Sequence, residues 1–302
     1  MMHYDMAFLG FGSIAKRHLK NVCDYLTSRG DTYSIDLYRS SLNNPIPAEL
    51  REFISKSYLY ADGPQKCYDV VFITNPTAIH YDSICKFKNN TKSFFIEKPI
   101  FDKIDINDSL LDEIKNVISY VACPLRYHPV LQYVFKYINY KDALAVRAIS
   151  SSYLPDWRPN QDYRQCYSAH RDMGGGVGID LIHEWDYLFS LFGMPDKVFS
   201  IQDKISQLEI DSDDIAIYIA KCTGKTIELH LDYFGRKTMR TLTLFMPDET
   251  IFCDMANGRI DFLKKEESID LNADRNLFQL AEIIHFFDIV DQLNSLENLY
   301  DQ

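Results

Sequence analysis

The sequence predicts an α/β protein of two domains: a doubly wound parallel sheet over residues 1–120, then an α+β domain over residues 121–302. Apolar strand-like runs alternate with helical periodicities over the first 120 residues or so, and a glycine-rich turn follows the first run. From about residue 145, alternating strands follow one another with little helix between them. Parallel strands need crossovers, whereas consecutive alternating strands pair as an antiparallel sheet with one packed face.

The elements of the first domain follow from apolar spacing. Residues 6–9 form a short strand that runs into the glycine turn, and Ile14, His18 and Val22 recur at four-residue spacing, which predicts a helix. The other elements expected are strands over 33–38, 69–74, 94–97 and 117–122, a helix that contains His80 and Ile84, and a helix over 110–116.

The second domain is expected to start with a strand over 145–152 and a helix over 176–192. The strands expected after them span 197–204, 215–221, 227–233, 241–245 and 250–254. A final amphipathic helix over 275–293 has one apolar stripe that includes Ile283 and Phe287, which is typical of a helix packed on a core.

Composition limits the functional classes. A chain of 302 residues with 46% hydrophobic and 25% charged residues is an ordinary folded protein, and its net charge of -11 argues against a broad nucleic-acid or anionic-membrane surface. The seven cysteines contain no CxxC pair, so we expect neither a metal site nor a disulfide framework. We expect no signal peptide and no apolar run of membrane length, and hence a cytoplasmic protein.

A dinucleotide fingerprint, Gly10-x-Gly12-x-x-Ala15, lies between the first strand and the first helix. The first glycine permits the tight turn, and Gly12 lets the backbone approach a pyrophosphate. The turn, with Ser13 and Ile14, is therefore expected to bind the cofactor at the helix N-terminus. Glycine pairs also occur in ordinary turns, so the position between strand and helix carries this prediction.

The end of the second strand bears on the choice of cofactor. An acidic residue there would bind the ribose 2′-hydroxyl of NAD, but the chain has Arg39 and Ser40, whereas Asp36 lies inside the strand. An arginine with neighbouring hydroxyl groups fits a 2′-phosphate, so NADP(H) is favoured and NAD(H) is the alternative. The other interpretation of Arg39 is a solvated loop residue.

Three residues have the chemistry needed to move hydride to or from an alcohol carbon. Lys98 follows a buried strand, where its charge can lower the pKa of a substrate hydroxyl, although such a lysine is often only a surface residue. Asp180 and His183 are three residues apart, so on one helix they would share a face. His183 could accept the hydroxyl proton, and Asp180 could orient it.

A loop rich in arginine and aromatic residues precedes this helix. Trp157, Arg158 and Arg164, with Arg126 from an earlier turn, predict a binding site for a carboxylate or phosphate group on the substrate. The alternative is a loop used in packing or in a subunit contact.

Several tracts occur in a recognisable order: Gly10-x-Gly12-x-x-Ala15, Thr74-Asn75-Pro76-x-x-x-His80, Glu97-Lys98-Pro99, Arg126-Tyr127-His128-Pro129 and Gly174-Gly175-Gly176…Asp180…His183-Glu184-x-Asp186. Together they resemble the glucose–fructose oxidoreductase/inositol dehydrogenase (Gfo/Idh/MocA) family. The resemblance implies a Rossmann domain, then an α+β domain whose large open, mostly antiparallel sheet makes homodimers or homotetramers. It implies that Lys98, Asp180 and His183 surround the reacting carbon.

The same resemblance places a further set of residues with the cofactor: Thr74, Asn75, Pro76, His80 and Glu97. Two features depart from the family pattern. The aspartate commonly precedes the histidine by four positions, not three. The chain also ends soon after residue 293, so the helix that often returns to the first domain is expected to be missing.

The sequence therefore predicts an NAD(P)-dependent oxidoreductase acting on a secondary alcohol or ketone of a sugar, sugar acid or nucleotide-activated sugar. Resemblance to one branch of the family suggests bacterial surface-sugar synthesis, and the arginines suggest an anionic substrate. Two alternatives stay open: a non-catalytic nicotinamide-nucleotide sensor or regulator, and a redox-cycling epimerase or glycosidase.

Overall fold

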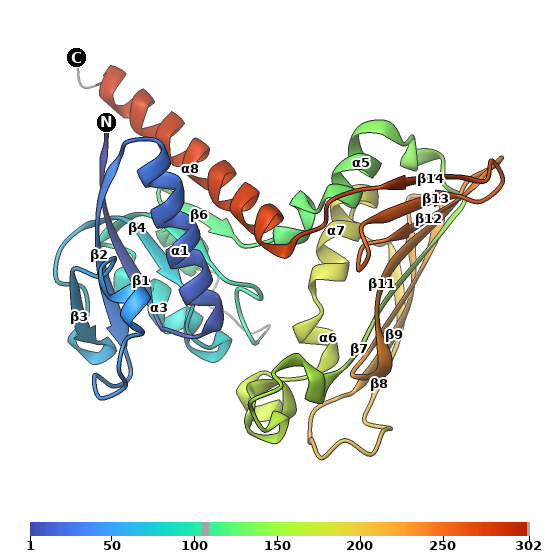
Figure 1. The fold of residues 1–302 in the computed structure, drawn as a ribbon, viewed down its shortest axis with the longest axis horizontal. Coiled ribbons are helices and arrows are strands. Elements are labelled where there is room, and N and C mark those ends of the chain that lie inside the picture. Colours follow the sequence, from blue (N-terminus) through green and yellow to red (C-terminus); the bar gives the residue numbers. More distant parts are fainter. Residues whose placement is uncertain (104–108, 301–302) are drawn as a thin grey trace. The chain divides into compact units, whose positions relative to one another are not determined.

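The chain forms two compact units in the computed structural model, which describes residues 1–103 and 109–300, with side chains as far as residue 293. The first unit comprises Met1–Ala122 together with Gln279–Gln302, and the second comprises Cys123–Phe278. Figure 1 shows the elements of each unit.

The first unit contains a six-stranded sheet in the order β3-β2-β1-β4-β5-β6, with every pair of neighbours parallel (Figure 1). Its strands are β1 (His3–Leu9), β2 (Thr32–Arg39), β3 (Lys56–Leu59), β4 (Tyr68–Ile73), β5 (Thr91–Ile96) and β6 (Ile118–Val121). Its helices are α1 (Ser13–Ser28), α2 (Ala48–Arg51), α3 (His80–Phe87) and α4 (Ser109–Glu113), with short 3-10 turns η1 (Tyr60–Asp62) and η2 (Thr77–Ile79). The predicted doubly wound parallel sheet is confirmed.

Two apolar cores lie on the opposite faces of this sheet. On one face, α1 packs against Met6, Phe8 and Phe72. On the other face, α3 and α4 pack against a set that includes Leu9 and Val71. Successive strand residues point to opposite faces, so the continuous apolar runs of β1 and β4 supply both cores.

The C-terminal helix α8 (Arg275–Tyr300) packs on the first unit. Ile283, Phe286, Phe287 and Val290 are buried in the same core as α1. The expectation that the returning helix is missing is therefore wrong, and these buried residues of α8, which fall in the range 121–302 expected for the second domain, pack in the core of the first unit. The buried face includes Ile283 and Phe287 of the predicted stripe, whereas Leu277 is exposed.

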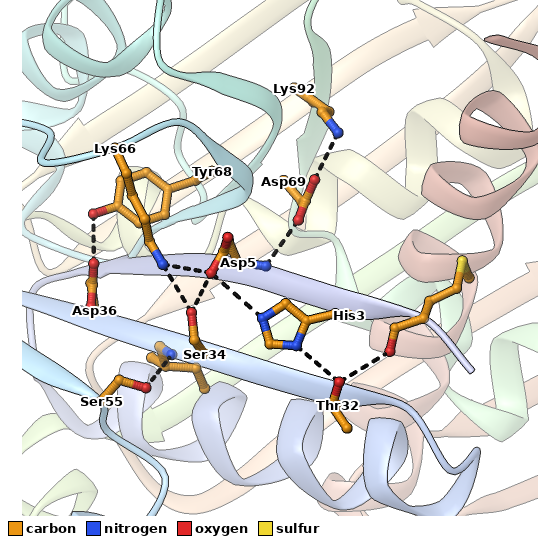
Figure 2. A network of polar contacts seen from close by, with 12 residues as sticks. His3, Asp5, Thr32, Ser34, Asp36, Ser55, Lys66, Tyr68, Asp69 and Lys92 are labelled. Carbon is orange, nitrogen blue, oxygen red and sulfur yellow. Dashed lines mark hydrogen bonds and ion pairs between the residues drawn. The ribbon is translucent and has the colours of Figure 1, made fainter. Parts of the chain in front are cut away.

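Charged side chains join the strands of the first sheet near their amino ends (Figure 2). Lys66 Nζ donates to Asp5 at 2.5 Å and to Ser34 at 2.9 Å. Asp69 accepts from the backbone N–H of Asp5 at 2.9 Å and from Lys92 Nζ at 2.9 Å. This network ties β1, β2, β4 and β5 together at the edge opposite their carboxyl ends.

The second unit contains an eight-stranded sheet in the order β14-β13-β12-β11-β7-β10-β9-β8. Its strands are β7 (Ala145–Tyr153), β8 (Lys197–Asp203), β9 (Ile215–Cys222), β10 (Lys225–Asp232), β11 (Phe234–Phe245), β12 (Thr250–Asp254), β13 (Arg259–Phe262) and β14 (Glu267–Asp270). Only the β7–β10 pair is parallel, so the predicted mostly antiparallel sheet is confirmed.

Helices cover one face of this sheet. They are α5 (Pro129–Tyr137), α6 (Val177–Asp180) and α7 (His183–Phe192), and the 3-10 turns are η3 (Pro124–Tyr127), η4 (Tyr140–Asp142), η5 (Leu154–Trp157), η6 (Tyr163–Gln165), η7 (Tyr167–Ala169) and η8 (Arg171–Met173). Leu131 and Leu188 from these helices share a core with Val146 and Leu229 of the sheet. Phe199 and Ile201 of the edge strand β8 are exposed.

The predicted continuous helix over 176–192 is wrong, because the helix is interrupted between α6 and α7. Leu181 leaves the helical region with φ -96° and ψ 25°. The buried Glu184 carboxylate accepts from Arg240 Nε of β11 at 2.8 Å, which anchors the first turn of α7 independently of α6. Asp180 ends α6 and His183 begins α7, so the two residues do not share one regular helix face.

Over the described part of the chain, no helix combines the length and the apolar character needed to cross a membrane. Among the same residues there is also no group of three or more His, Cys, Asp and Glu side chains arranged to hold a metal ion.

Candidate functional site

The sequence motifs of the first unit gather at the carboxyl edge of its parallel sheet. Gly10 follows β1, Arg39 ends β2, Thr74 follows β4 and Glu97 follows β5. The β1 strand pairs with both β2 and β4, which lie on opposite sides of it (Figure 1). Ligands of open α/β sheets bind outside such carboxyl ends, at the point where the strand order reverses.

Gly10 requires glycine for two independent reasons. Its φ is +94°, a conformation that residues with a side chain rarely adopt. A Cβ built on it would lie 2.8 Å from Asn75 Cα, because the turn after β1 packs directly against the turn after β4. Thr74 supports this packing by donating from Oγ1 to the Leu9 carbonyl at 2.9 Å.

The N-terminus of α1 fits an anionic group. Gly12 is the N-cap residue, it has no side chain with which to cap the helix, and the first turn contains no acidic residue. Gly12 and Ser13 are exposed, and a Cβ on Gly12 would meet nothing within 4 Å. The backbone N–H groups of this turn are thus accessible to a ligand such as a pyrophosphate, while Ile14 is half-buried.

Arg39 folds back on the loop that follows β2. Its guanidinium donates to the Asn44 carbonyl at 2.6 Å and to the Leu42 carbonyl at 3.4 Å, and Ser40 is exposed. Asp36 is buried and accepts from the Tyr68 hydroxyl at 2.9 Å, so its carboxylate is committed inside the unit.

The Glu97-Lys98 tract follows β5 directly. Lys98 is half-buried, and a cis peptide bond links it to Pro99. Glu97 contacts His18 Nε2 of α1, with 2.6 Å between that nitrogen and Glu97 Oε1. Sequence reasoning had placed His18 only in the apolar stripe of α1, because nothing in the local pattern shows a partner 79 residues away.

His80, predicted to lie with the cofactor, is buried and turned toward backbone carbonyls. Its Nε2 lies 2.9 Å from the Asn75 carbonyl, and its Nδ1 lies 3.1 Å from the Pro99 carbonyl. Burial lowers the pKa of this imidazole, although the carbonyl contacts oppose that shift. His80 therefore links the Asn75 turn to the segment after Lys98.

In the second unit, Asp180 is a buried carboxylate held by tyrosine. It is 5% exposed, and Tyr233, which follows β10, donates its hydroxyl to Asp180 Oδ2 at 2.5 Å. Burial, followed by the charge and hydrogen bond of Asp180, raises the pKa of the Tyr167 hydroxyl. The sequence motif gave Asp180 and His183, but Tyr233 and Tyr167 were missed because they come from separate segments.

Two residues of the predicted substrate loop surround this pair of tyrosines. Trp157 meets Tyr233 edge to face with 5.3 Å between ring centroids, and its Nε1 donates to Ser152 Oγ at 2.9 Å. Arg158 lies over the ring of Tyr167 at 5.8 Å from the centroid. The structure thus brings Trp157 and Arg158 to the surroundings of Asp180.

The other two predicted substrate arginines have acidic partners. Arg164 donates to Asp162 at 2.9 Å and to Glu209 at 3.1 Å. Arg126 makes a two-pronged contact with Asp186, one helical turn beyond His183, at 2.6 and 2.9 Å. Such fork geometry satisfies a guanidinium well, so these charges are already paired.

The chain matches no protein-family model and no curated protein sequence. Several solved structures share its fold. A levoglucosan dehydrogenase in complex with NADH and levoglucosan superposes with a TM-score of 0.80 at 15% identity, over 96% of this chain and 90% of that one. UDP-N-acetylglucosamine 3-dehydrogenase GnnA from Acidithiobacillus ferrooxidans gives 0.73 at 18% identity, over 97% and 90%.

The WlbA dehydrogenase from Bordetella pertussis, in complex with NADH and UDP-GlcNAcA, gives a TM-score of 0.70 at 13% identity, over 83% of this chain and 77% of that one. These similarities show that the chain has the two-unit fold of this group of dehydrogenases.

Proposed function

We propose that the protein is an NAD(P)-dependent oxidoreductase of the Gfo/Idh/MocA type that acts on a secondary alcohol or ketone of a sugar, sugar acid or nucleotide-activated sugar. The observation that carries this proposal is the retention of Lys98, Asp180 and His183 in a chain whose fold matches sugar and sugar-nucleotide dehydrogenases over nearly its whole length. A non-catalytic sensor of the same fold would have no need of all three residues.

Each residue has a distinct part in the reaction. A bound nicotinamide supplies the hydride acceptor or donor. Lys98 stabilises the negative charge that develops on the substrate oxygen, because an ammonium group favours the alkoxide. His183 takes the hydroxyl proton during oxidation and returns it during reduction. Asp180, held by Tyr233, orients His183 or a second substrate hydroxyl.

For the cofactor, we propose that the turn from Gly10 to Ile14 binds the pyrophosphate and that Arg39 and Ser40 bind a 2′-phosphate, so that NADP(H) is preferred. The turn of Thr74, Asn75 and Pro76 would border the nicotinamide half, together with Glu97 and Lys98.

For the substrate, we propose an anionic sugar that Arg158 and Trp157 recognise. Arg158 lies over the ring of Tyr167, and within the part of the chain that the structure describes it forms no ion pair with a carboxylate. Two of the similar structures point to an anionic substrate. GnnA is named for UDP-N-acetylglucosamine, and the WlbA structure contains UDP-GlcNAcA, and both of these compounds carry a diphosphate group. A role in bacterial surface-sugar synthesis, in the cytoplasm and as a homodimer or homotetramer, would suit such a substrate.

A turnover screen tests the function. Reduction of NAD+ and NADP+ is followed by nicotinamide absorbance with levoglucosan, UDP-N-acetylglucosamine and UDP-N-acetylglucosaminuronic acid. We expect turnover of a UDP-linked sugar above that of neutral levoglucosan. Lys98→Ala and His183→Ala should each lower kcat roughly a hundredfold, the usual scale for a positioned acid–base or electrostatic group.

Two exposed residues of the first unit provide matched controls, Lys92→Ala and His3→Ala, which should leave kcat unchanged. Normal turnover in both Lys98→Ala and His183→Ala would show that the assigned site is wrong. Tight NADH binding without turnover of any sugar would instead favour the sensor.

A further inference from the structure

Two buried histidines from different elements hold the short segment that carries Lys98. His18 comes from α1 and contacts Glu97, the residue before Lys98. His80 comes from α3 and contacts the carbonyls of Pro99 and Ile100, the residues after it. Lys98 is thus bracketed on both sides by imidazole contacts within the first unit.

The His18 ring occupies a buried position where an apolar side chain would cost less desolvation free energy. It is 1% exposed, on the face of α1 that also buries Leu19 and Val22. Its ring meets Phe95 edge to face at 5.0 Å. Burying an imidazole costs free energy unless its nitrogen atoms find partners, and within the described residues only Nε2 has one. Packing alone therefore gives no reason for histidine here.

Glu97 supplies the reason. Burial opposes ionisation of its carboxyl group, but the hydrogen bond and charge of His18, with the charge and backbone N–H of Lys98, outweigh burial and hold its pKa below the usual value. The carboxylate therefore accepts from His18 on one side and from the backbone of Lys98 on the other. The backbone N–H of Glu97 also donates to the Ile73 carbonyl at 3.0 Å, which fixes the start of the segment to β4.

The same helix connects this contact to the predicted pyrophosphate site. His18 lies on α1 only a little more than one turn after Ser13, where the exposed helix N-terminus begins. An α-helix is a rigid rod over such a short length. A contact at His18 therefore places Glu97, and the lysine after it, at a fixed distance from the N-terminus of α1.

We propose that His18 is a positioning residue for Lys98: its Nε2–H donates to the Glu97 carboxylate and so fixes the backbone from which the lysine side chain extends. His80 completes the support from the other side through the carbonyls of Pro99 and Ile100. The catalytic part of this inference rests on the proposed function, because it takes Lys98 to be the group that stabilises the substrate oxygen.

Hydrogen–deuterium exchange on the ligand-free protein tests the support directly. In His18→Ala, the backbone amides of Lys98, Ile100 and Phe101 should exchange roughly fivefold faster or more, because a local contact is lost. In His18→Gln, whose amide N–H can reach the position of Nε2, exchange should return toward the wild-type rate. If His18→Ala does not fold, His18→Asn, whose amide is too short to reach Glu97, takes its place.

Val22→Ala is the matched control, since it removes buried volume from the same helix without touching Glu97. It should lower stability with no selective change at residues 98–101. Unchanged exchange at this segment in His18→Ala, or equal acceleration in Val22→Ala or in His18→Gln, would overturn the proposal.

Kinetics with whichever UDP-linked sugar or levoglucosan is turned over then tests the catalytic part. His18→Ala should lower kcat roughly tenfold or more with little change in KM, since small misplacement of a catalytic group costs this much. In a Lys98→Ala background the same change should have no further effect on kcat, and His18→Gln should recover most of the activity.

The outcomes separate the two claims. If Lys98→Ala itself keeps full activity, the proposed role of Lys98 fails, and the exchange result still decides whether His18 holds the segment. If Lys98→Ala is impaired and His18→Ala lowers kcat equally in both backgrounds, His18 acts independently of Lys98 and the positioning role is refuted.

Discussion

Glu97 of the first unit, and Asp180 and Glu184 of the second, are carboxylates among or beside the candidate residues, and each is held by a side chain from another element. Tyr233 donates to Asp180, Arg240 donates to Glu184, and His18 contacts Glu97. Burying a carboxylate costs free energy unless its oxygen atoms are hydrogen-bonded. These partners therefore make it possible for the folded protein to bury the three charged groups. The chemistry of each residue therefore depends on a second residue that no local motif contains.

Arg39 gives a prediction about the cofactor. Its guanidinium donates to two neutral carbonyls, of Leu42 and Asn44, and a 2′-phosphate would be a stronger, charge-assisted acceptor. NADP(H) should therefore bind more tightly than NAD(H). Arg39→Ala should weaken NADPH binding about tenfold or more and leave NADH binding unchanged, as measured by calorimetric titration. Arg51→Ala, another arginine that donates to a loop carbonyl, is the control. Equal or tighter NADH binding by the wild type would contradict the prediction.

His128 gives a prediction about pH. Burial, and then the charge of Arg240, lower the pKa of its imidazole to about 4, from 6.5. The unfolded chain therefore binds more protons than the folded one between those values, so the free energy of unfolding rises with pH across this window and falls as pH drops toward 4. From pH 7 to pH 5 the loss from this group should be about 2 kcal/mol.

Urea unfolding at both pH values measures this loss. His128 is the N-cap residue of α5, and its Nδ1 accepts from the Val130 N–H at 3.2 Å. His128→Asn keeps an N-cap acceptor but does not titrate, so its stability should change about 2 kcal/mol less between pH 7 and pH 5 than that of the wild type. The same pH dependence in both proteins would show that His128 is not the group responsible.

At the scale of elements, the apolar pattern of the sequence predicted the strands with clear alternation and did not predict the short strands without it. The strand expected over 250–254 is β12, residue for residue. The unpredicted strands β3, β13 and β14 are four residues each and mostly not buried, so their sequences carry little alternation. The interruption between α6 and α7 was missed because the apolar spacing continues across it, and the anchoring Arg240 is 56 residues away from Glu184.

The candidate site residues also fall into those that the sequence could predict and those that it could not. The requirement for glycine at Gly10 could be predicted, since it follows from a strand that runs into a helix through a tight turn. The pairing of Arg126 with Asp186 and of Arg164 with Asp162 could not, because a sequence lists charges without their partners. Their assignment as substrate ligands stays a prediction that the ion pairs do not favour.

The helix α8 gives a prediction for the first unit. Phe286 is fully buried and contacts Phe72, Phe95 and Tyr120 at 6.1, 5.2 and 5.5 Å between ring centroids. Phe286→Ala should therefore lower the free energy of unfolding by about 3–5 kcal/mol. Leu277→Ala, at a position 47% exposed on the same helix, should change it by less than about 0.5 kcal/mol. Denaturant unfolding, monitored by the loss of NADH binding, measures the free energy of unfolding of both variants. Equally small changes in the two variants would show that α8 does not stabilise this unit.

At the scale of the whole molecule, the second sheet has one face covered by helices and another that carries apolar side chains. Phe199 and Ile201 of β8 are 60% and 65% exposed, and Ile219 of the neighbouring β9 is 50% exposed. The registers pair Phe199 with Ile219, so these side chains adjoin on one face. Exposed apolar side chains that adjoin one another are typical of an interaction surface. The net charge of -11 favours repulsion between copies over the charged parts of the surface. A contact formed by apolar residues does not bring those charges together.

We therefore expect the purified protein to be a homodimer or homotetramer joined through this face. Ile201→Asp places a charge in the centre of the patch, where it would be desolvated in the assembly, and should convert the protein to monomers in analytical ultracentrifugation. Leu111→Asp, at a residue 57% exposed on α4 of the first unit, changes charge and exposure similarly and should leave the mass unchanged. A monomeric wild type, or an assembly that survives Ile201→Asp, would show that the exposed residues of β8 and β9 have no part in self-association.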